Sequence, residues 1–220
     1  MRILICEDSV LLREGIVRLL EDAGHEVVAA LSDTSILDER VHAEDPELCI
    51  LDVRLPPTFT DEGIRAALRL RAANPERPLL VLSQYVEERY ASELIAVPGG
   101  PLGYLLKDRV ADVTEFLESV ERIGQGATVL DPEVVAQLLS RRIRDERMAA
   151  LTDRERQVLA LIAEGRSNQA IAGVLFLSEA SIEKHITSIF QKLGLEPDEH
   201  GNRRVLAALA HIENTGGTTT

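Results

Sequence analysis

One short stretch constrains the fold more than any other part of the chain. Residues 48–51, Leu-Cys-Ile-Leu, form a continuous apolar run that ends in Asp52, and Pro56 and Pro57 prevent a regular strand from continuing. Such a run is typical of a strand buried on both faces, as in a parallel sheet covered by helices. Asp52 then stands at the carboxyl end of the strand, where open α/β sheets bind ligands. Taken alone, Asp52 is better explained as a cap of the following loop.

The first half of the chain alternates apolar runs with helical patterns. Strands are expected over residues 2–6, 27–31, 48–51, 78–82 and 102–106. Helices are expected over residues 10–22, 33–41, 60–73, 87–96 and 112–123. Strands that alternate with helices in this way predict an α/β fold, a doubly wound (βα)5 domain with a parallel sheet, which we place at residues 1–126.

Polar residues stand at the ends of four of these strands, and a parallel sheet brings such ends to one edge. The group consists of Glu7, Asp8, Asp52, Ser83 and Lys107. Three carboxylates held close together repel one another unless a cation lies among them. Mg²⁺ suits such a site because it needs only one or two carboxylates and is completed by water and phosphate oxygens. An aspartate beside such a cation can act as a nucleophile and form an aspartyl-phosphate, with Lys107 and Ser83 holding the phosphoryl oxygens.

Together with Tyr104 in the last strand, this group resembles the receiver domain of two-component response regulators. The resemblance implies that Asp52 is the phosphoacceptor. It also implies that Asp8, Asp52 and the backbone carbonyl of Arg54 bind Mg²⁺, and that Glu7 acts mainly through water.

The same resemblance assigns a switch to two residues of the domain and phosphate pairing to a third. Ser83 is the switch hydroxyl, at a position where the family more often carries Thr, and Tyr104 is the switch aromatic. Both are expected to move inward on phosphorylation, while Lys107 pairs with the phosphoryl group. Residues 98–101, Pro-Gly-Gly-Pro, are unusual for the loop before the last strand and are expected to stiffen or displace the switch face.

Residues 127–149 are expected to form a helical linker. Asp131 is suited to cap a helix whose first residue is Pro132, and apolar residues recur as far as Ile143 before the sequence becomes charged. The charged end is most simply a solvated linker. A helix of this length could also fix one domain against the other or pair with a second chain, and the sequence leaves these alternatives open.

The second half predicts a small all-α domain with a helix-turn-helix. Thr152 and Glu155 have the spacing of a capping box at the start of one helix, and Ser178 is placed to cap a helix over residues 179–193. A short helix over residues 168–175 and a tight turn precede that last helix, which is the order of a helix-turn-helix. We place this domain at residues 150–213 and expect a disordered tail at residues 214–220.

The sequence of residues 151–159, 165–172 and 182–186 resembles that of the LuxR-type DNA-binding domain. The two halves together resemble a response regulator of the NarL/FixJ class. The resemblance implies that the helix over residues 179–193 enters the major groove of double-stranded promoter DNA. Base contacts are then expected from Glu183, Lys184 and Thr187, and phosphate contacts from Asn168, Ser181, His185, Ser188 and Lys192.

Two of these DNA contacts have alternatives. Glu183 could accept a hydrogen bond from cytosine N4 or could merely screen Lys184. His185 is as readily explained by a half-buried hydrogen bond as by a phosphate contact.

Charge and composition set further limits. The formal net charge is −13, and residues 131–220 hold 11 Lys and Arg against 13 Asp and Glu, so charge alone does not suggest DNA binding. Both cysteines, Cys6 and Cys49, lie in apolar runs, which favours buried thiols in a reducing compartment. Apolar segments are shorter than a membrane span, so we expect a cytoplasmic protein that does not bind membranes.

The function expected from these features is phosphorylation-dependent control of transcription. The expected partners are a sensor histidine kinase, promoter DNA and, after phosphorylation, a second copy of the chain. We expect no enzymatic activity beyond phosphoryl transfer to Asp52. Two alternatives are a receiver that binds proteins while DNA binding is independent of phosphate, and a phosphatase-like hydrolase, for which the sequence shows no substrate pocket or additional base.

Overall fold

The computed structural model describes residues 1–196 and 202–216 and divides the chain into two compact units. The first unit is Met1–Leu138 and the second is Leu139–Thr220. Helix α6, Pro132–Ala149, contains the boundary between them. Each unit has a hydrophobic core formed by its own residues, so we describe each by itself.

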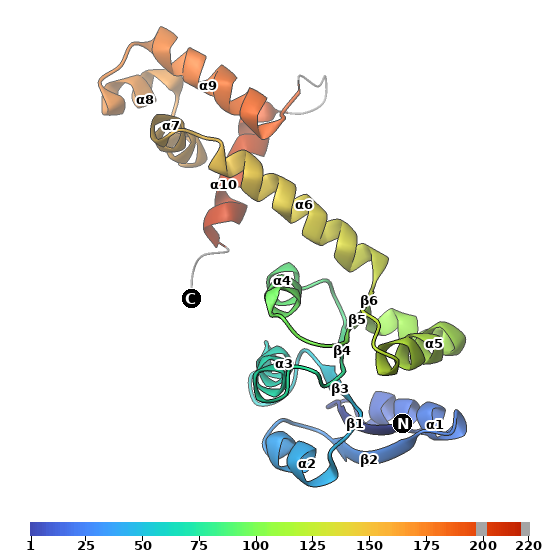
Figure 1. Ribbon diagram of the computed structural model, residues 1–220. Helices are drawn as coiled ribbons and strands as arrows, with labels where there is room; N and C mark the ends of the chain where they lie inside the picture. Colours follow the sequence, from blue (N-terminus) through green and yellow to red (C-terminus); the bar gives the residue numbers. More distant parts are fainter. Residues whose placement is uncertain (197–201, 217–220) are drawn as a thin grey trace. The chain divides into compact units, whose positions relative to one another are not determined.

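The first unit is a parallel sheet covered by helices, which confirms the doubly wound fold (Figure 1). The strand order is β2-β1-β3-β4-β5-β6, and every neighbouring pair is parallel. The strands are β1 Arg2–Cys6, β2 Glu26–Leu31, β3 Leu48–Asp52, β4 Leu79–Ser83, β5 Leu102–Leu106 and β6 Val129–Leu130. The helices are α1 Val10–Asp22, α2 Leu37–Glu44, α3 Glu62–Ala73, α4 Glu88–Ala96, the 3₁₀ helix η1 Lys107–Ala111 and α5 Val113–Gly124.

Two apolar cores lie on opposite faces of this sheet. On one face, side chains of α2, α3 and α4 pack against alternate strand residues such as Cys6, Leu51 and Val81. On the other face, α1 and α5 pack against the intervening residues, such as Ile5 and Ile50. Residues of β1, β3, β4 and β5 are therefore buried on both sides, as the continuous apolar runs predict.

The start of the expected linker is part of the first unit, which corrects the expectation that residues 127–149 are a separate linker. Val129 and Leu130 form β6, which pairs with β5, and Val134 of α6 is fully buried in the first core. Two residues are too short a run to show a strand pattern, so no sequence signal predicts this sixth strand.

The second unit consists of helices, as expected. They are α7 Asp153–Ala163, α8 Asn168–Leu175, α9 Glu179–Leu193 and α10 Arg203–Gly216, joined by the last part of α6. The capping box of Thr152 and Glu155 is confirmed, and the hydroxyl of Ser178 caps α9 by accepting from the amide of Ser181. Because α10 runs to Gly216, residues 214–216 are helical and not a disordered tail, and residues 217–220 lie outside the described part of the chain.

Among the residues that the structure describes, no helix is long and apolar enough to cross a membrane.

Candidate functional site

The parallel sheet brings the expected carboxylates together. Glu7 and Asp8 follow β1, Asp52 ends the neighbouring strand β3, and carboxylate oxygens of all three lie within 4.8 Å of one another. Glu7 and Asp52 are buried, whereas Asp8 is half-buried. The amide of Ser9 donates to Glu7 Oε1 at 3.1 Å, and the amide of Arg54 donates to Asp52 Oδ1 at 3.3 Å. Two of the three carboxylates are therefore shielded from water, and the third, Asp8, is in contact with it.

Lys107 supplies the cation of this cluster. Its Nζ lies 2.9 Å from Asp52 Oδ2 and 2.8 Å from Glu7 Oε2. Burial lowers the pKa of Lys107, but the hydrogen bonds and charges of Glu7 and Asp52 outweigh burial and raise it above its usual value. Burial raises the pKa of Glu7 and of Asp52, and Lys107 offsets part of that rise. With Glu7, Asp8 and Asp52 ionised, one ammonium against three carboxylates leaves an excess of negative charge.

The two expected switch residues lie in neighbouring strands, Ser83 at the end of β4 and Tyr104 within β5. Ser83 ends β4 and its hydroxyl donates to the carbonyl of Tyr85 at 2.5 Å. Tyr104 in β5 has no exposed surface, and its buried hydroxyl has no hydrogen-bond partner within the described residues. Burial raises the pKa of Tyr104. The side chain of Tyr104 therefore lies inside the domain, and its movement on phosphorylation stays a prediction.

Arg54 connects the loops on either side of Asp52. Its guanidinium forms an ion pair with Glu87 at 2.5 Å and lies over the ring of Tyr85, 5.6 Å from the centroid. The first contact raises the pKa of Arg54. Arg54 comes from the loop after β3, whereas Tyr85 and Glu87 precede α4, so the loops that flank Asp52 are held together.

A glycine at the start of α3 allows the close approach that places Asp52. A Cβ atom on Gly63 would lie 1.6 Å from the carbonyl oxygen of Asp52, which leaves no room for any side chain. The amide of Gly63 also donates to the carbonyl of Val53 at 3.0 Å. Gly63 is not among the expected site residues, and its sequence signal is a glycine near the start of a helix.

The unusual loop at residues 98–101 is held by a buried arginine. Arg71 of α3 is 2% exposed, and its guanidinium donates to the carbonyls of Pro75, Gly100 and Pro101 at 3.2, 2.7 and 3.3 Å. Burial lowers the pKa of Arg71. The loop is therefore fixed to the end of α3, and its effect on the switch face stays a prediction.

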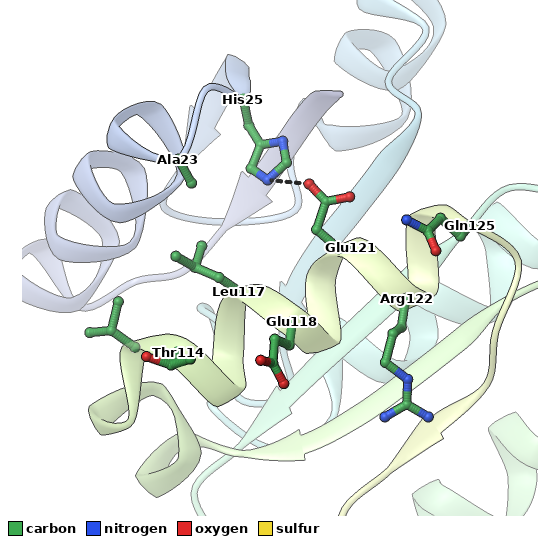
Figure 2. Close-up of a pocket in the computed structure, with 9 residues that line it drawn as sticks. Ala23, His25, Thr114, Leu117, Glu118, Glu121, Arg122 and Gln125 are labelled. Carbon is green, nitrogen blue, oxygen red and sulfur yellow. Dashed lines mark ion pairs between the residues drawn. The ribbon is translucent and has the colours of Figure 1, made fainter.

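A hollow elsewhere on the first unit is separate from this cluster. It has a volume of about 550 Å³ and lies between the end of α1 and helix α5. Figure 2 shows His25, Leu117 and Glu121 facing it, and His25 Nε2 lies 3.4 Å from Glu121 Oε1. None of the expected site residues lines it.

The outer face of α9 presents the residues expected to read bases. Glu183, Lys184 and Thr187 are exposed, while Ile182 and Ile186 on the inner face are buried. The hydroxyl of Thr187 donates to the carbonyl of Glu183 at 2.9 Å within the helix. His185 is half-buried.

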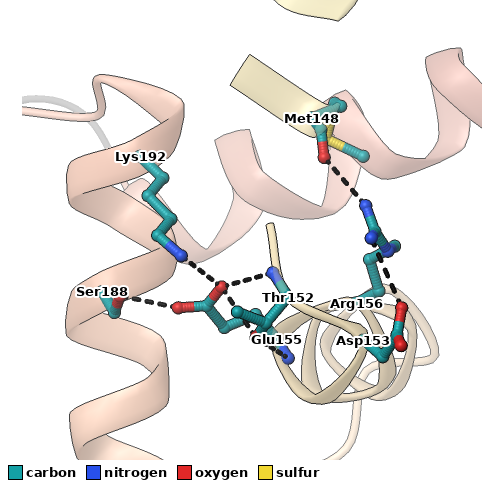
Figure 3. A network of polar contacts seen from close by, with 7 residues as sticks. All are labelled: Met148, Thr152, Asp153, Glu155, Arg156, Ser188 and Lys192. Carbon is teal, nitrogen blue, oxygen red and sulfur yellow. Dashed lines mark hydrogen bonds and ion pairs between the residues drawn. The ribbon is translucent and has the colours of Figure 1, made fainter. Parts of the chain in front are cut away.

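Two of the expected phosphate contacts are held by Glu155, as Figure 3 shows. Glu155 is 4% exposed, accepts from Ser188 Oγ at 2.7 Å, and lies 2.7 Å from Lys192 Nζ. The amide of Thr152 also donates to it at 2.7 Å. Burial alone would raise the pKa of Glu155, but Lys192, Ser188 and Thr152 outweigh it and lower the pKa to about 2. Ser188 and Lys192 therefore fasten α9 to α7, a role that sequence analysis missed.

Two other phosphate candidates, Asn168 and Ser181, also have partners inside the unit. Asn168 at the start of α8 accepts from Arg204 of α10 at 2.8 Å, and Arg204 donates as well to the carbonyl of Arg166. The hydroxyl of Ser181 lies 2.8 Å from that of Ser178. All of these groups are at least partly exposed, so each can take a further hydrogen bond from outside.

Two family models match the chain, one in each unit. Residues 3–120 match the response regulator receiver domain, and residues 149–207 match the bacterial regulatory proteins of the luxR family.

Curated relatives match over most of their length. The chain is 34% identical over 196 residues to a nitrate/nitrite response regulator protein homolog of Haemophilus influenzae, covering 89% of this chain and 91% of the relative. It is 30% identical over 217 residues to the DNA-binding transcriptional activator DevR/DosR of Mycobacterium tuberculosis, covering 96% and 94%.

Solved structures share the fold. The RcsB response regulator of Salmonella typhimurium superposes with a TM-score of 0.66 at 23% identity, covering 97% of this chain and 99% of that chain. A structure of an RcsB–DNA complex gives a TM-score of 0.59 at 23% identity, covering 100% and 99%.

Proposed function

The chain belongs to the response regulators that join a receiver domain to a LuxR-type DNA-binding domain, and we propose that phosphorylation of Asp52 switches its activity as a DNA-binding transcription regulator. The observation that carries this proposal is the cluster at the end of β3. Asp52 lies there among two further carboxylates and the ammonium of Lys107.

The cluster fits a bound Mg²⁺ by its chemistry. Its donors are carboxylate oxygens, which hard divalent cations prefer, and its one ammonium does not neutralise them. Asp8, Asp52 and the backbone carbonyl of Arg54 would hold the ion, with Glu7 acting mainly through water. Bound there, Mg²⁺ would neutralise charge on the carboxylates and on phosphoryl oxygens.

Each residue of the cluster then has a role in accepting the phosphoryl group. An oxygen of the Asp52 carboxylate attacks phosphorus, and the bond from phosphorus to the imidazole nitrogen of the kinase histidine breaks. Lys107, already within ion-pair distance of Asp52, pairs with a phosphoryl oxygen. The hydroxyl of Ser83 turns from the carbonyl of Tyr85 to donate to another. Tyr104, which is buried within β5, is the proposed switch aromatic.

Promoter DNA is the proposed target of the second unit. Glu183, Lys184 and Thr187 on the exposed face of α9 are placed to meet base edges in a major groove. Phosphate contacts are proposed for three further residues of α9, which are His185, Ser188 and Lys192. They are also proposed for Asn168 at the start of α8 and for Ser181 in the first turn of α9. The proposal that a phosphorylated homodimer binds is supported by the apolar residues that α10 leaves exposed, which are Val205, Leu206, Leu209 and Ile212.

A direct test is phosphoryl uptake from acetyl phosphate and Mg²⁺, measured by intact-protein mass. Wild type should gain one phosphoryl group, and Asp52→Asn should gain none. Asp38→Asn, which removes an exposed carboxylate of α2, is the matched control and should be phosphorylated like wild type. Equal uptake by wild type and Asp52→Asn would exclude Asp52 as the acceptor.

One observation favours a second function, a receiver that controls DNA binding without phosphate. Arg71 fixes the loop at residues 98–101, before β5, by donating to the carbonyls of Gly100 and Pro101. DNA selected from a random pool by the wild-type protein provides the probe. If beryllofluoride with Mg²⁺ leaves the affinity for that DNA unchanged, the phosphate-independent function is the correct one.

A further inference from the structure

An ion pair with one buried member, Asp131, lies at the start of helix α6 within the first unit. Asp131 has a fully buried side chain, and Arg109 contacts it twice, from Nε to Oδ2 at 2.8 Å and from Nη2 to Oδ1 at 3.4 Å. Asp131 Oδ1 also accepts from the amide of Glu133 at 3.0 Å. Asp131 therefore both holds Arg109 and satisfies an amide in the first turn of α6.

Arg109 belongs to the segment that carries Lys107. Both residues lie in η1, Lys107–Ala111, which directly follows β5. Lys107 contacts Glu7 and Asp52, and Arg109, two residues later, contacts Asp131. A single short segment thus connects the acidic cluster with the start of α6.

The backbone makes the same connection a second time. The amide of Asp131 donates to the carbonyl of Tyr104 at 2.9 Å, and β6 pairs with β5 through Gly103 and Tyr104. Both the side chain and the main chain of Asp131 are therefore attached to the strand and helix that hold Tyr104 and Lys107.

Separating Arg109 from Asp131 costs free energy. Removing Arg109 from Asp131 would leave a buried carboxylate without its counter-ion, which is strongly unfavourable. Burial would raise the pKa of Asp131, but Arg109 and the amide of Glu133 lower it, so the carboxylate stays charged. Movement of η1 is therefore expected to carry Asp131 with it.

We propose that Arg109 is a positioning residue that, through its ion pair with Asp131, transmits a change at Lys107 to the first turn of α6. The inference rests on the proposed phosphorylation of Asp52. Helix α6 continues into the second unit, where Arg147 donates to the carbonyl of Leu193 at the end of α9 at 3.0 Å. The start of α6 is thus the first part of the helix to respond to the cluster.

Hydrogen exchange of the full chain tests this inference, with beryllofluoride and Mg²⁺ as the probe. In wild type, exchange should change both in peptides that cover residues 48–56 and in peptides that cover residues 129–138. The variants are Arg109→Gln, Asp131→Asn and the double variant. Asparagine is as good a helix cap as aspartate, so Asp131→Asn removes the charge and keeps the cap. Arg69→Gln, which breaks the exposed pair with Asp38, is the matched control.

The expected result is that all three variants keep the change at residues 48–56 and lose the change at residues 129–138. The double variant should lose no more than either single variant, because each single change already removes the pair. Phosphoryl uptake from acetyl phosphate should match wild type in all of them, which shows that the cluster is intact.

Other outcomes overturn the inference in distinguishable ways. Variants that respond at residues 129–138 as wild type does would show that the pair transmits nothing. A wild type that responds at residues 48–56 but not at 129–138 would overturn the inference and leave the phosphoacceptor site standing. A wild type that responds at neither would overturn the proposed site and the inference with it.

Discussion

Replacing Glu155 with glutamine tests how the second unit is held together. Glu155 is buried beneath α9 and carries the negative charge of a network that reaches Thr152, Ser188 and Lys192 (Figure 3). Glutamine has nearly the same shape and keeps one carbonyl oxygen as an acceptor. It removes the charge that pairs with Lys192 and adds an amide group that has no acceptor in this network.

The size of the effect follows from the pKa of Glu155. A fall from 4.5 to about 2 corresponds to about 3 kcal/mol of stability, at about 1.4 kcal/mol for each pKa unit. Lys192 is 31% exposed, so water screens part of the interaction, and we expect a loss of about 2 to 3 kcal/mol at pH 7. Glu164→Gln, which breaks an exposed pair with Arg166, should cost less than about 0.5 kcal/mol.

The assay is urea unfolding of the full chain read by pulsed hydrogen exchange in peptides of α7 and α9. The free energy of unfolding is expected to fall by about 1 kcal/mol per molar urea. Glu155→Gln should therefore lower the urea concentration at which these peptides are half-unfolded by about 2 M. Peptides of the first unit, such as those of β1 and β3, should keep their midpoint. A shift below about 0.5 M in α7 and α9 would show that the network does not stabilise the unit and would refute the reasoning.

The same variant makes a prediction about pH. The pKa of Glu155 is lowered by folding, so its contribution is complete above its unfolded value of about 4.5 and is lost as the pH falls towards about 2. The difference in midpoint between wild type and Glu155→Gln should therefore shrink between pH 4.5 and pH 2. A difference that stays constant over that range would contradict a charged Glu155.

Two further predictions concern the first unit. Gly63→Ala should slow phosphoryl uptake from acetyl phosphate by about 100-fold, because a Cβ atom 1.6 Å from the carbonyl oxygen of Asp52 must displace that residue. Gly15→Ala, where a Cβ meets nothing within 4 Å, should leave uptake unchanged, and equal rates for the two would refute this account. Arg71→Met should destabilise the unit by about 3 kcal/mol in urea unfolding, since it removes the donor of three carbonyls. Arg69→Met, on the exposed side of α3, should change stability by less than about 0.5 kcal/mol, and a similar small change for Arg71→Met would contradict its role.

The features that the sequence predicts are those that depend on residues close together in the chain. The apolar run before Asp52 identifies a buried strand, and the rule that parallel strand ends share an edge brings Glu7 and Lys107 to it. The capping box of Thr152 and Glu155 was equally visible, because its two residues are three positions apart.

What could not be predicted depends on contacts between distant segments. Glu155 contacts Ser188 and Lys192 only because α7 and α9 pack together. No local sequence pattern predicts these contacts. Arg71 sits in an amphipathic helix where an arginine is expected to face solvent, yet carbonyls of the loop at 98–101 bury it. Asp131 was correctly expected to cap a helix, but its pair with Arg109 required the sixth strand to be known.

Two side chains near Asp52 are bonded to partners that a phosphoryl oxygen can replace, so a phosphate-dependent switch can act through both. These side chains are Ser83 and Lys107. Ser83 would leave the carbonyl of Tyr85, and Lys107 would share its charge with a group more negative than the Asp52 carboxylate. The first exchange releases the loop before α4 and the second acts on η1, which Arg109 joins to the start of α6.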